Sequence, residues 1–436
     1  MNKYVIFWSI TVGLGGMLFG MDMTVISGVE KTIKELWQLD DWTHGFAMAT
    51  ALYGTVIGAA FGGIPADKFG RKKTLFWIGL SFLISSIGAA LANDVASFMI
   101  FRFLGGLGIG ASSVVAPIYI SEIAPAKHRG KLVISFQLNI VLGILIAYVS
   151  NYFLNGLGEN DWRYMLAIVA LPSLLFSILI LFTPESPTFL LLQRNDLANA
   201  KKILSLVDTE TDATIKRILE KKSESIQNEN VFTKKYYRPL LLAFLFSFFN
   251  QVSGINAVLY YAPRIFEKAH LDKSSALLQS AGIGVTNLIF TLLGWYFIDR
   301  VGRKVLMYVG SLGYIISLSL IAFSFYSNSF EWVPIYIFAF IAAHAIGQGS
   351  VIWVFISEIF PNSVRASGMA WGSLTHWVLA ALITNFFPIF TTLFGEKYIF
   401  AFFAFMMVGQ LVYVKFLMPE TKGATLEEIE NQIIIH

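Results

Sequence analysis

Two ionisable side chains lie inside long apolar stretches of this sequence, and they are the first candidates for chemistry. Asp22 interrupts one uncharged run and Arg102 interrupts another. A charged side chain at the bilayer centre costs about 2.5–3.5 kcal/mol on insertion scales, so such residues usually mark an ion or proton path. Asp22 lies six residues before Gly28, which is about 9 Å along a helix. We therefore expect Asp22 to bind a proton below the membrane surface; the alternative is a carboxylate solvated at the headgroup boundary.

Arg102 has the depth that a partner of Asp22 would need. It lies about seven residues from the outer end of its stretch, which matches the depth of Asp22 to within a few Å. An ion pair between the two side chains would moderate both insertion costs, and protonation of Asp22 would release Arg102. The alternative is that Arg102 extends to the outer headgroups.

A third apolar stretch carries four polar side chains within seven residues, namely Asn250, Gln251, Ser253 and Asn256. Such groups are costly in lipid, so we expect them to line a cavity. Gln251 and Asn256 point apart on a regular helix, but Gly254 permits a break that turns both toward one ligand, as in the broken helices of transporters. Other polar and aromatic side chains within apolar stretches are Gln137, Asn139, Asn287, Gln348, Trp353, His376 and Trp377.

This set of side chains predicts the chemistry of the ligand. Amides both donate and accept hydrogen bonds, and aromatic rings stack on apolar ring faces. Together they suit a neutral polyhydroxylated molecule better than an ion. Taken singly, each of these residues is more often a packing or helix–helix contact.

Acid and base motifs occur twice in the chain. Asp67–Lys72 returns as Asp299–Lys304 after 232 residues, and Pro184-Glu185-Ser186 returns as Pro419-Glu420-Thr421 after 235. Ser121–Pro125 followed by Arg129 likewise returns as Ser357–Pro361 followed by Arg365, after 236 residues. Three matches in one order indicate two duplicated halves with a substrate site near the midplane between them.

The acids and bases of these motifs are expected to form ion pairs between helix ends and to close the cytoplasmic side in one state. The alternative is that the Lys and Arg only set the orientation of the chain in the membrane, but this does not explain the acids. Gly70 and Gly302 are expected to take positive φ in the tight turns. The expected gate residues are Asp67, Arg71, Glu122, Arg129, Asp299, Arg303, Glu358 and Arg365.

The elements that position these residues are membrane-spanning helices. The chain is 56% apolar and only 14% charged, whereas soluble domains carry about 25% charged residues. Twelve apolar stretches are long enough to span a bilayer, which predicts an all-α membrane protein with twelve transmembrane helices in two six-helix bundles. They cover residues 5–28, 44–64, 74–92, 95–118, 132–154, 164–182, 239–262, 276–298, 305–326, 333–357, 367–390 and 397–417.

Charge in the loops predicts the orientation. The loops 65–73, 119–131, 299–304 and 358–366 hold 11 Lys and Arg in total, against 6 in the opposite loops, so both termini are expected in the cytoplasm. The expected domains are an N-terminal bundle (1–182), a cytoplasmic linker with short amphipathic helices (183–238), a C-terminal bundle (239–418) and a cytoplasmic tail (419–436).

Several classes of function are excluded. The chain has no cysteine, its six histidines show no metal-ligand spacing, and it lacks a phosphate-binding Gly-Lys-Ser/Thr loop. The glycines of 105–110 lie inside an apolar stretch with no preceding strand, so they are not a dinucleotide loop. No basic cluster indicates nucleic acid, and no nucleophile–base pair indicates an enzyme. We therefore expect no metal and no cofactor.

With these motifs the chain resembles the sugar porters of the major facilitator superfamily over nearly its whole length. The resemblance implies the twelve-helix fold just described, alternating access and monosaccharide transport. It also implies that Asp22 and Arg102 are the proton-coupling pair of the symporters. The matching segments are Gly15–Asp22, Asp67–Lys73, Arg102 with the glycines after it, Ser121–Gly130, Asp161–Arg163, Pro184–Pro187, Gln251–Pro263, Asp299–Lys304, Ser357–Arg365 and Pro419–Gly423.

The resemblance also implies the sugar-binding residues, and here the chain departs from the family pattern. The implied contacts are Gln137, Gln251, Asn256, Asn287, Trp353 and Trp377, with Asn250 and His376 beside them. Asn250 replaces a glutamine and His376 replaces an amide. The other departures are Ser350 in place of proline, Thr188 in place of arginine and Ile144 in place of a glutamine found in some members. They leave hexose and pentose as alternatives.

The interpretation is a proton-coupled monosaccharide symporter in the lipid bilayer of a bacterial inner membrane, working as a monomer. A facilitative sugar uniporter is the first alternative, but facilitators of the family usually lack the acid at Asp22. A sugar sensor is the second, but sensors carry long cytoplasmic tails, whereas 418–436 is short.

Overall fold

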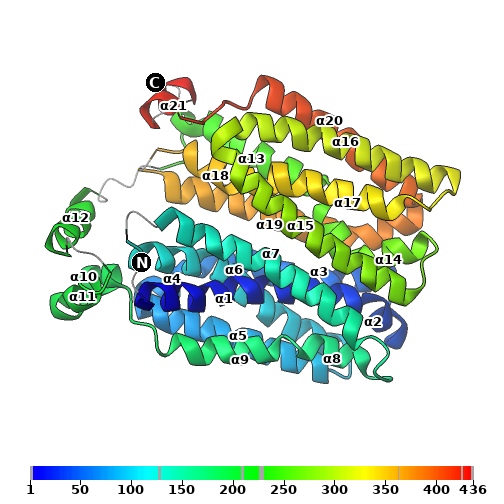
Figure 1. Cartoon of the computed structure of the whole chain (residues 1–436), viewed down its shortest axis with the longest axis horizontal. Coiled ribbons are helices and arrows are strands. Elements are labelled where there is room, and N and C mark those ends of the chain that lie inside the picture. The colour runs from blue at the N-terminus through cyan, green and yellow to red at the C-terminus, as the bar shows by residue number, and fades with distance from the viewer. Residues whose placement is uncertain are drawn as a thin grey trace. The chain divides into compact units, whose positions relative to one another are not determined.

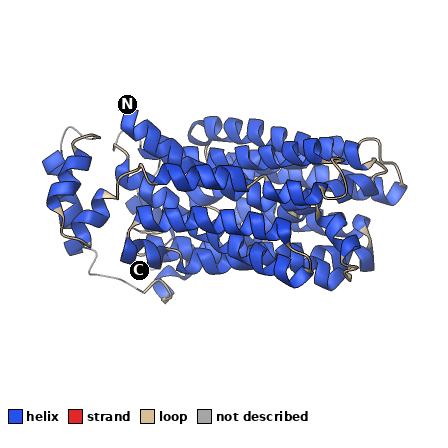
Figure 2. Cartoon of the chain, turned by 90° about the horizontal axis from the view of Figure 1, so that it is seen from below, coloured by secondary structure: helices blue, strands red, loops and turns tan. Residues whose placement is uncertain are grey.

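The computed structural model describes residues 3–125, 129–207, 211–224, 230–361, 363–423 and 426–433. All regular structure in these ranges is helical (Figure 2). Within the described residues, twelve helical segments are long and apolar enough to cross a membrane, which confirms the expected number and the all-α fold. They are Lys3–Gly28, Asp41–Phe61, Arg71–Leu91, Val95–Ile123, Ser135–Leu154, Asp161–Ile180, Lys234–Lys268, Lys273–Val301, Arg303–Ser327, Val333–Glu358, Arg365–Phe394 and Glu396–Phe416.

Helix ends follow from local sequence. Asp94 precedes α6 (Val95–Ile123), and its side chain accepts a 2.9 Å hydrogen bond from the Ser97 N–H. Asp272 precedes α15 (Lys273–Val301) in the same way, and hydrogen bonds from Ser275 hold the pKa of Asp272 below its usual range. Each acid satisfies N–H groups that a helix start leaves without partners. A short polar side chain therefore caps the start of each of these two helices.

The chain divides into two compact units. Unit 1 comprises Met1–Val25, Thr50–Ala147 and Gly158–Asn228, and unit 2 comprises Ile26–Ala49, Tyr148–Leu157 and Glu229–His436. This division places 26–49 and 148–157 with the second half of the chain, whereas the boundaries expected from the sequence lie at 182 and 239. The expected domain boundaries stay a prediction.

The long helices of unit 1 run side by side, with α6 packed on α5 and α1 (Figure 1). Its helices are α1 (Lys3–Val25), α4 (Gly63–Phe69), α5 (Arg71–Leu91), α6, α8 (Asp161–Ala167), α9 (Ala170–Ile180), α10 (Pro187–Leu192), α11 (Leu197–Leu204) and α12 (Thr211–Glu224). Two further helices, α3 (Asp41–Phe61) and α7 (Arg129–Leu154), contribute residues to both units.

Unit 2 holds the second set of spans, in which α16 packs on α20 and α13 packs on α19. Its elements are η1 (Ile26–Gly28), α2 (Glu30–Leu36), η2 (Lys234–Tyr236), α13 (Tyr237–Val252), α14 (Ile255–Lys268), α15, α16 (Arg303–Ser327), α17 (Val333–His344), the π-helix η3 (Ala345–Gly349), α18 (Ser350–Glu358), α19 (Arg365–Phe394), α20 (Glu396–Phe416) and α21 (Leu426–Ile433).

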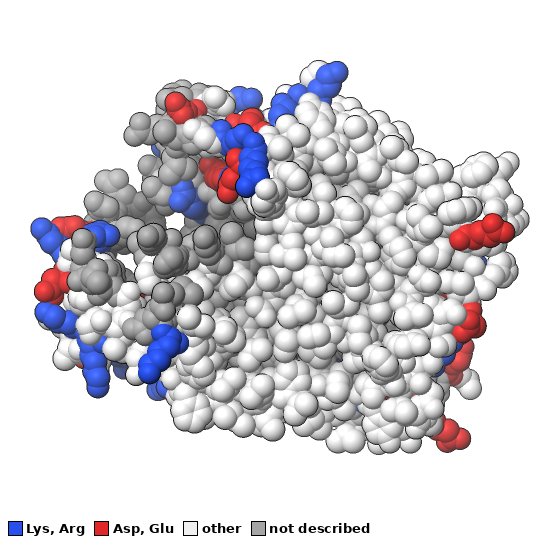
Figure 3. All heavy atoms as spheres, in the orientation of Figure 1, with Lys and Arg blue, Asp and Glu red and all other residues white. Residues whose placement is uncertain are grey.

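The polar segment before the seventh span forms short helices. Helices α10, α11 and α12 enclose a small apolar core of Leu191, Ala200, Leu204 and Ile215. Their outer faces carry charge, and in Figure 3 the coloured acidic and basic side chains gather near helix ends and on these short helices. Along the lengths of the spans the same view is almost entirely white, as a lipid-facing surface requires.

Candidate functional site

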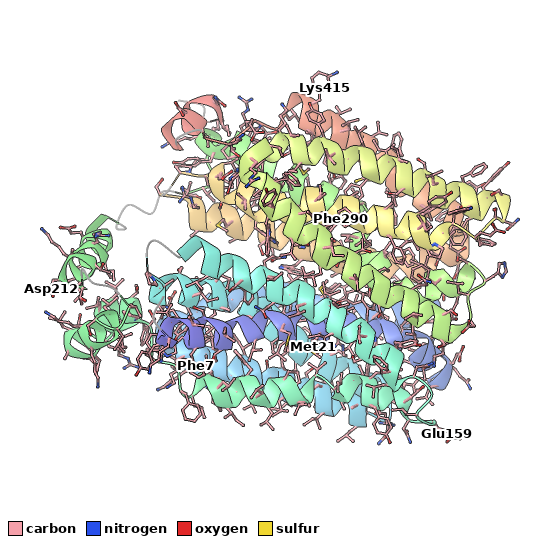
Figure 4. The ribbon with its side chains drawn as sticks, viewed as in Figure 1. Phe7, Met21, Glu159, Asp212, Phe290 and Lys415 are labelled. Atoms are coloured by element: carbon pink, nitrogen blue, oxygen red, sulfur yellow. The ribbon has the colours of Figure 1, made fainter. Side chains whose placement is uncertain are left out.

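Asp22 and Arg102 form a buried ion pair in unit 1. Arg102 Nη1 donates to Asp22 Oδ1 at 2.9 Å, and Nη2 donates to the backbone oxygen of the same residue at 2.9 Å. The two residues are 0% and 1% exposed. The structure thus brings together the two charges that were matched by depth. Figure 4 labels Met21, the neighbour of Asp22, between Phe7 near the start of α1 and Glu159 just before α8.

The second carboxylate oxygen of Asp22 is left open. Among the described residues, no hydrogen-bond partner meets Asp22 Oδ2, nor the nearby hydroxyl of Ser85 on α5. A methyl group on Gly105 would lie 3.1 Å from Oδ2 and 2.4 Å from Ser85 Oγ. The glycine therefore keeps the space beside Oδ2 clear, and Oδ2 is the atom at which this carboxylate can take a proton.

The seventh span breaks where Gly254 was expected to break it. Helix α13 ends at Val252 and α14 begins at Ile255, while Gly254 has φ 84°. A Cβ there would lie 2.3 Å from the ring of Phe403, so both conformation and space require glycine. The break lets Asn256 Nδ2 donate to Gln251 Oε1 at 2.6 Å, although these side chains diverge on a continuous helix.

Aromatic rings from α18 and α19 lie beside these amides. Gln251 Nε2 is 3.2 Å from each ring nitrogen of His376, and it donates to Asn250 Oδ1 at 2.9 Å. The His376 ring lies 5.2 Å from that of Trp353 and 4.8 Å from that of Trp377, measured between centroids. Unit 2 therefore gathers six of the predicted sugar-binding residues into one polar and aromatic cluster.

Two predicted sugar-binding residues stand apart from that hydrogen-bonded cluster. In the described chain the one side-chain hydrogen bond of Asn287 comes from Thr291, one turn along α15, at 3.4 Å. Gln137 is half-buried on α7, in the part of that helix that belongs to unit 1. Their contact with a ligand stays a prediction.

The acid–base motif of unit 1 joins three segments. Arg71, at the start of α5, donates to both oxygens of Glu122 at 3.1 and 3.2 Å and lies 3.1 Å from Asp67. Glu185 accepts the backbone N–H groups of Arg71 and Lys72 at 2.9 and 3.1 Å, so it caps α5. The expected ion pairs between helix ends are therefore present in this unit.

Unit 2 repeats this arrangement group by group. Arg303 donates to both oxygens of Glu358 at 3.2 and 2.7 Å and to Asp299 at 2.9 Å. Glu420 caps α16 by accepting the backbone N–H groups of Arg303 and Lys304 at 3.0 and 2.9 Å. The duplication inferred from sequence thus extends to the geometry of the charged groups.

The glycines of both turns have the positive φ that was expected. Gly70 has φ 104° and Gly302 has φ 99°. A Cβ at these positions would lie 2.1 Å from Glu185 Oε2 and 2.6 Å from Glu420 Oε2. Glycine is required because the capping carboxylate occupies the space of a side chain.

The remaining gate residues are less tightly placed. Arg365 Nε donates to the backbone oxygen of Phe360 at 3.2 Å, and no ion pair to it occurs in the described ranges. The side chain of Arg129 lies outside what the structure describes. The gating role of all eight residues stays a prediction.

Sequence reasoning missed a buried acid–base pair at the other end of the spans. His44 Nε2 lies 3.0 Å from Glu30 Oε2, and the side chains are 0% and 2% exposed. The ring of Tyr261 lies 6.0 Å from that of His44. His44 within an apolar span was a usable signal, but Glu30 looked like a loop residue because it lies between two spans.

Ser350, one of the departures, takes part in a wide helical turn. Its hydroxyl donates to the carbonyl of Ala345 at 2.6 Å, beside the π-helix η3. The tenth span therefore keeps an irregular turn ahead of Trp353 without a proline at this position.

No cluster of three metal-ligating side chains occurs in the described part of the chain.

Comparisons with known proteins agree over the whole chain. Residues 8–433 match the family model described as "Sugar (and other) transporter". An arabinose-proton symporter of Bacillus subtilis (strain 168) is 36% identical, covering 98% of this chain and 95% of its own length. A glucose transporter of Staphylococcus epidermidis is 35% identical, covering 99% of this chain and 97% of its own. A solved inward-open conformation of the xylose transporter XylE from E. coli has a TM-score of 0.88 and 32% identity, covering 99% and 100% of the two chains.

Proposed function

The chain belongs to the sugar transporter family of the major facilitator superfamily, and from that membership we propose that it is a monosaccharide–proton symporter with Asp22 as the coupling residue. As a member of this family it is a membrane transporter and not an enzyme. Its twelve candidate spans make it a multi-pass protein of the plasma membrane. Symport and facilitated diffusion differ in whether a proton must move with the sugar, so the proposal depends on the proton-binding site.

The observation that carries it is the open oxygen of a buried carboxylate. Asp22 Oδ1 is held by Arg102, while Oδ2 has no hydrogen-bond partner in the described chain. A buried ion pair is tolerated because each charge compensates the other. A facilitator gains nothing from such a pair in its apolar interior, whereas a symporter needs one group whose charge a proton can cancel.

The charge balance gives the coupling step. With Asp22 ionised, its pair with Arg102 carries no net charge. A proton bound at Oδ2 makes Asp22 neutral, leaves Arg102 as a cation and weakens the bidentate contact between α1 and α6. Loss of the proton restores the pair. The contact between these helices therefore has two states, and the proton decides between them.

The ligand side of the proposal rests on the cluster in unit 2. Asn250, Gln251 and Asn256 supply amide groups, and Trp353 and Trp377 supply aromatic rings beside His376. Neutral donors and acceptors beside aromatic rings fit a sugar ring, whose hydroxyls both donate and accept. From the family resemblance alone, we propose that Gln137 and Asn287 also contact the sugar.

The duplicated ion-pair sets are proposed to hold the cytoplasmic helix ends together in one state. Each set buries its arginine to about the same degree, with Arg71 and Arg303 side chains 11% and 10% exposed. Partly buried, multidentate pairs of this kind are worth more than surface pairs. We propose that they face the cytoplasm, where both termini lie, and that one chain is the working unit.

Sugar-evoked proton entry tests the proposal. Proteoliposomes with an internal pH dye and no imposed gradient receive D-glucose, D-xylose or L-arabinose outside. A symporter acidifies the lumen when its sugar enters, and a protonophore abolishes uphill uptake of the labelled sugar. Sugar entry that equilibrates without any proton movement identifies a facilitator, and binding without entry identifies a sensor.

A further inference from the structure

A chain of side-chain hydrogen bonds runs from the proposed sugar site through unit 2. Asn256 donates to Gln251 at 2.6 Å, Gln251 to Asn250 at 2.9 Å and Asn250 to Gln348 at 3.2 Å. Gln348 in η3 donates to Gln410 on α20 at 2.8 Å. We call this chain, with its final link to Ser311 on α16, the amide relay.

The far end of the amide relay is anchored to backbone. Gln410 Nε2 donates to the hydroxyl of Ser311 at 2.8 Å, and that hydroxyl donates its own hydrogen to the Met307 carbonyl at 2.7 Å. All six members are at most 4% exposed. Water therefore offers these groups little alternative, and each amide depends on its neighbours for partners.

The anchor sets the direction of every hydrogen bond in the relay. The Ser311 hydroxyl has one hydrogen, and the Met307 carbonyl takes it, so toward Gln410 the hydroxyl can only accept. Gln410 must then present its NH₂ to Ser311 and its oxygen to Gln348. An amide has an oxygen on one side and an NH₂ on the other, so each further amide inherits the same orientation.

The consequence appears at the sugar end. Asn256 must turn its NH₂ toward Gln251, which leaves its oxygen Oδ1 outside the relay. In the described ranges no hydrogen bond is made to that oxygen. The relay therefore presents Asn256 as a hydrogen-bond acceptor, which selects an O–H donor at that point of a ligand.

We propose that Ser311, Gln410 and Gln348 are positioning residues that set sugar selectivity by fixing the orientation of the amides at the binding site. The inference rests on the proposed function, because it states how that site recognises one hydroxyl of the sugar. It explains why unit 2 keeps these six polar side chains in its interior, where apolar side chains of similar shape can replace a hydrogen-bonded pair with little loss of stability.

The test compares sugars that differ by one hydroxyl. The full chain is purified, and binding of D-glucose, D-xylose and L-arabinose is measured by calorimetry. Each monodeoxy analogue of the tightest binder is then measured against the parent chain, Ser311→Ala and Gln410→Met. In the parent chain, removing the hydroxyl that donates to Asn256 should weaken binding by about tenfold.

Both variants remove the anchor that fixes the direction of the amides. The loss of affinity caused by removing that hydroxyl should therefore fall below about threefold, while the losses caused by removing the other hydroxyls should persist. Ser280→Ala is the matched control, because Ser280 is equally buried and bonds the Ala276 carbonyl at 2.8 Å outside the relay. Ser311→Thr keeps the hydroxyl and should keep the parental pattern. If Ser311→Ala does not fold, Gln410→Met carries the comparison.

Two outcomes overturn the inference while the proposed function stands. One is an unchanged deoxy profile in both variants. The other is a uniform loss of affinity for every analogue, which indicates a structural role only. A parent chain that binds none of the three sugars contradicts the proposed function itself, and the inference falls with it.

Discussion

At the scale of single residues, the site consists of a few polar groups whose surroundings decide what they do. Asp22 has one oxygen committed to Arg102 and one without a partner. Gln251 has its oxygen and both amide hydrogens committed, to Asn256, Asn250 and the His376 ring. The first arrangement suits a group that changes state, and the second suits a group held in one orientation.

Gln251→Ala should therefore weaken sugar binding by about tenfold or more, because the change removes one of the proposed sugar-binding amides and frees Asn256. Calorimetry on the purified chain measures this, with Gln193→Ala as the control, since Gln193 is exposed at the end of α10. Normal sugar affinity in Gln251→Ala would show that these amides only pack against one another and do not bind the sugar.

Sequence reasoning reached the residues whose signal is local. Asp22 and Arg102 were paired by equal depth, and Gly254 was identified because polar groups on both sides of it needed a break. Gln410 and Ser311 gave no such signal, since a single amide or hydroxyl in an apolar span is usually a helix–helix contact. Their partners are 62 and 99 residues away in the chain, so only the fold shows that they connect.

At the scale of elements, special backbone conformations position the charged groups. Gly302 has φ 99° and ψ 163°, a region that is essentially restricted to glycine. This turn aims the start of α16 at Glu420 and brings Arg303 to Glu358. Gly70 forms the same turn at the start of α5, so both motifs depend on a glycine with positive φ.

Gly302→Ala should lower the stability of the purified chain by about 1–3 kcal/mol, because alanine avoids that backbone region and its Cβ would meet Glu420. Thermal unfolding in detergent measures the change as a lower transition temperature. Gly63→Ala is the control, since Gly63 has ordinary helical φ and nothing within 4 Å of an added Cβ. Equal transition temperatures for the two variants would contradict this account of the turn.

At the scale of the whole molecule, the charges in the loops and the apolar surfaces of the helices both indicate a transporter that spans the membrane twelve times. Each span lies where the sequence predicts one, with bounds that differ by up to six residues, because long apolar runs specify spans directly. The grouping of 26–49 and 148–157 with unit 2 had no sequence signal, since it depends on which helix ends pack together. Orientation in the membrane rests on the loop charges.

The absence of cysteine makes that orientation measurable. We expect Glu159→Cys, between the fifth and sixth spans, to react with a membrane-impermeant maleimide in intact cells. Lys202→Cys, on α11, should react only after the cells are opened. The reverse pattern would place both termini outside.

The claim that Asp22 carries the coupled proton is tested most directly by Asp22→Asn, which keeps the shape of the side chain and removes its charge. A permanently neutral side chain still permits alternating access, so sugar-for-sugar exchange in proteoliposomes should persist. Accumulation of sugar under an imposed proton gradient should be lost, because no group at this position can take up and release the proton. Arg102 is left without a counter-charge, so some loss of stability is expected as well. Asp22→Asn proteoliposomes that still concentrate sugar under the proton gradient would show that the coupling residue lies elsewhere.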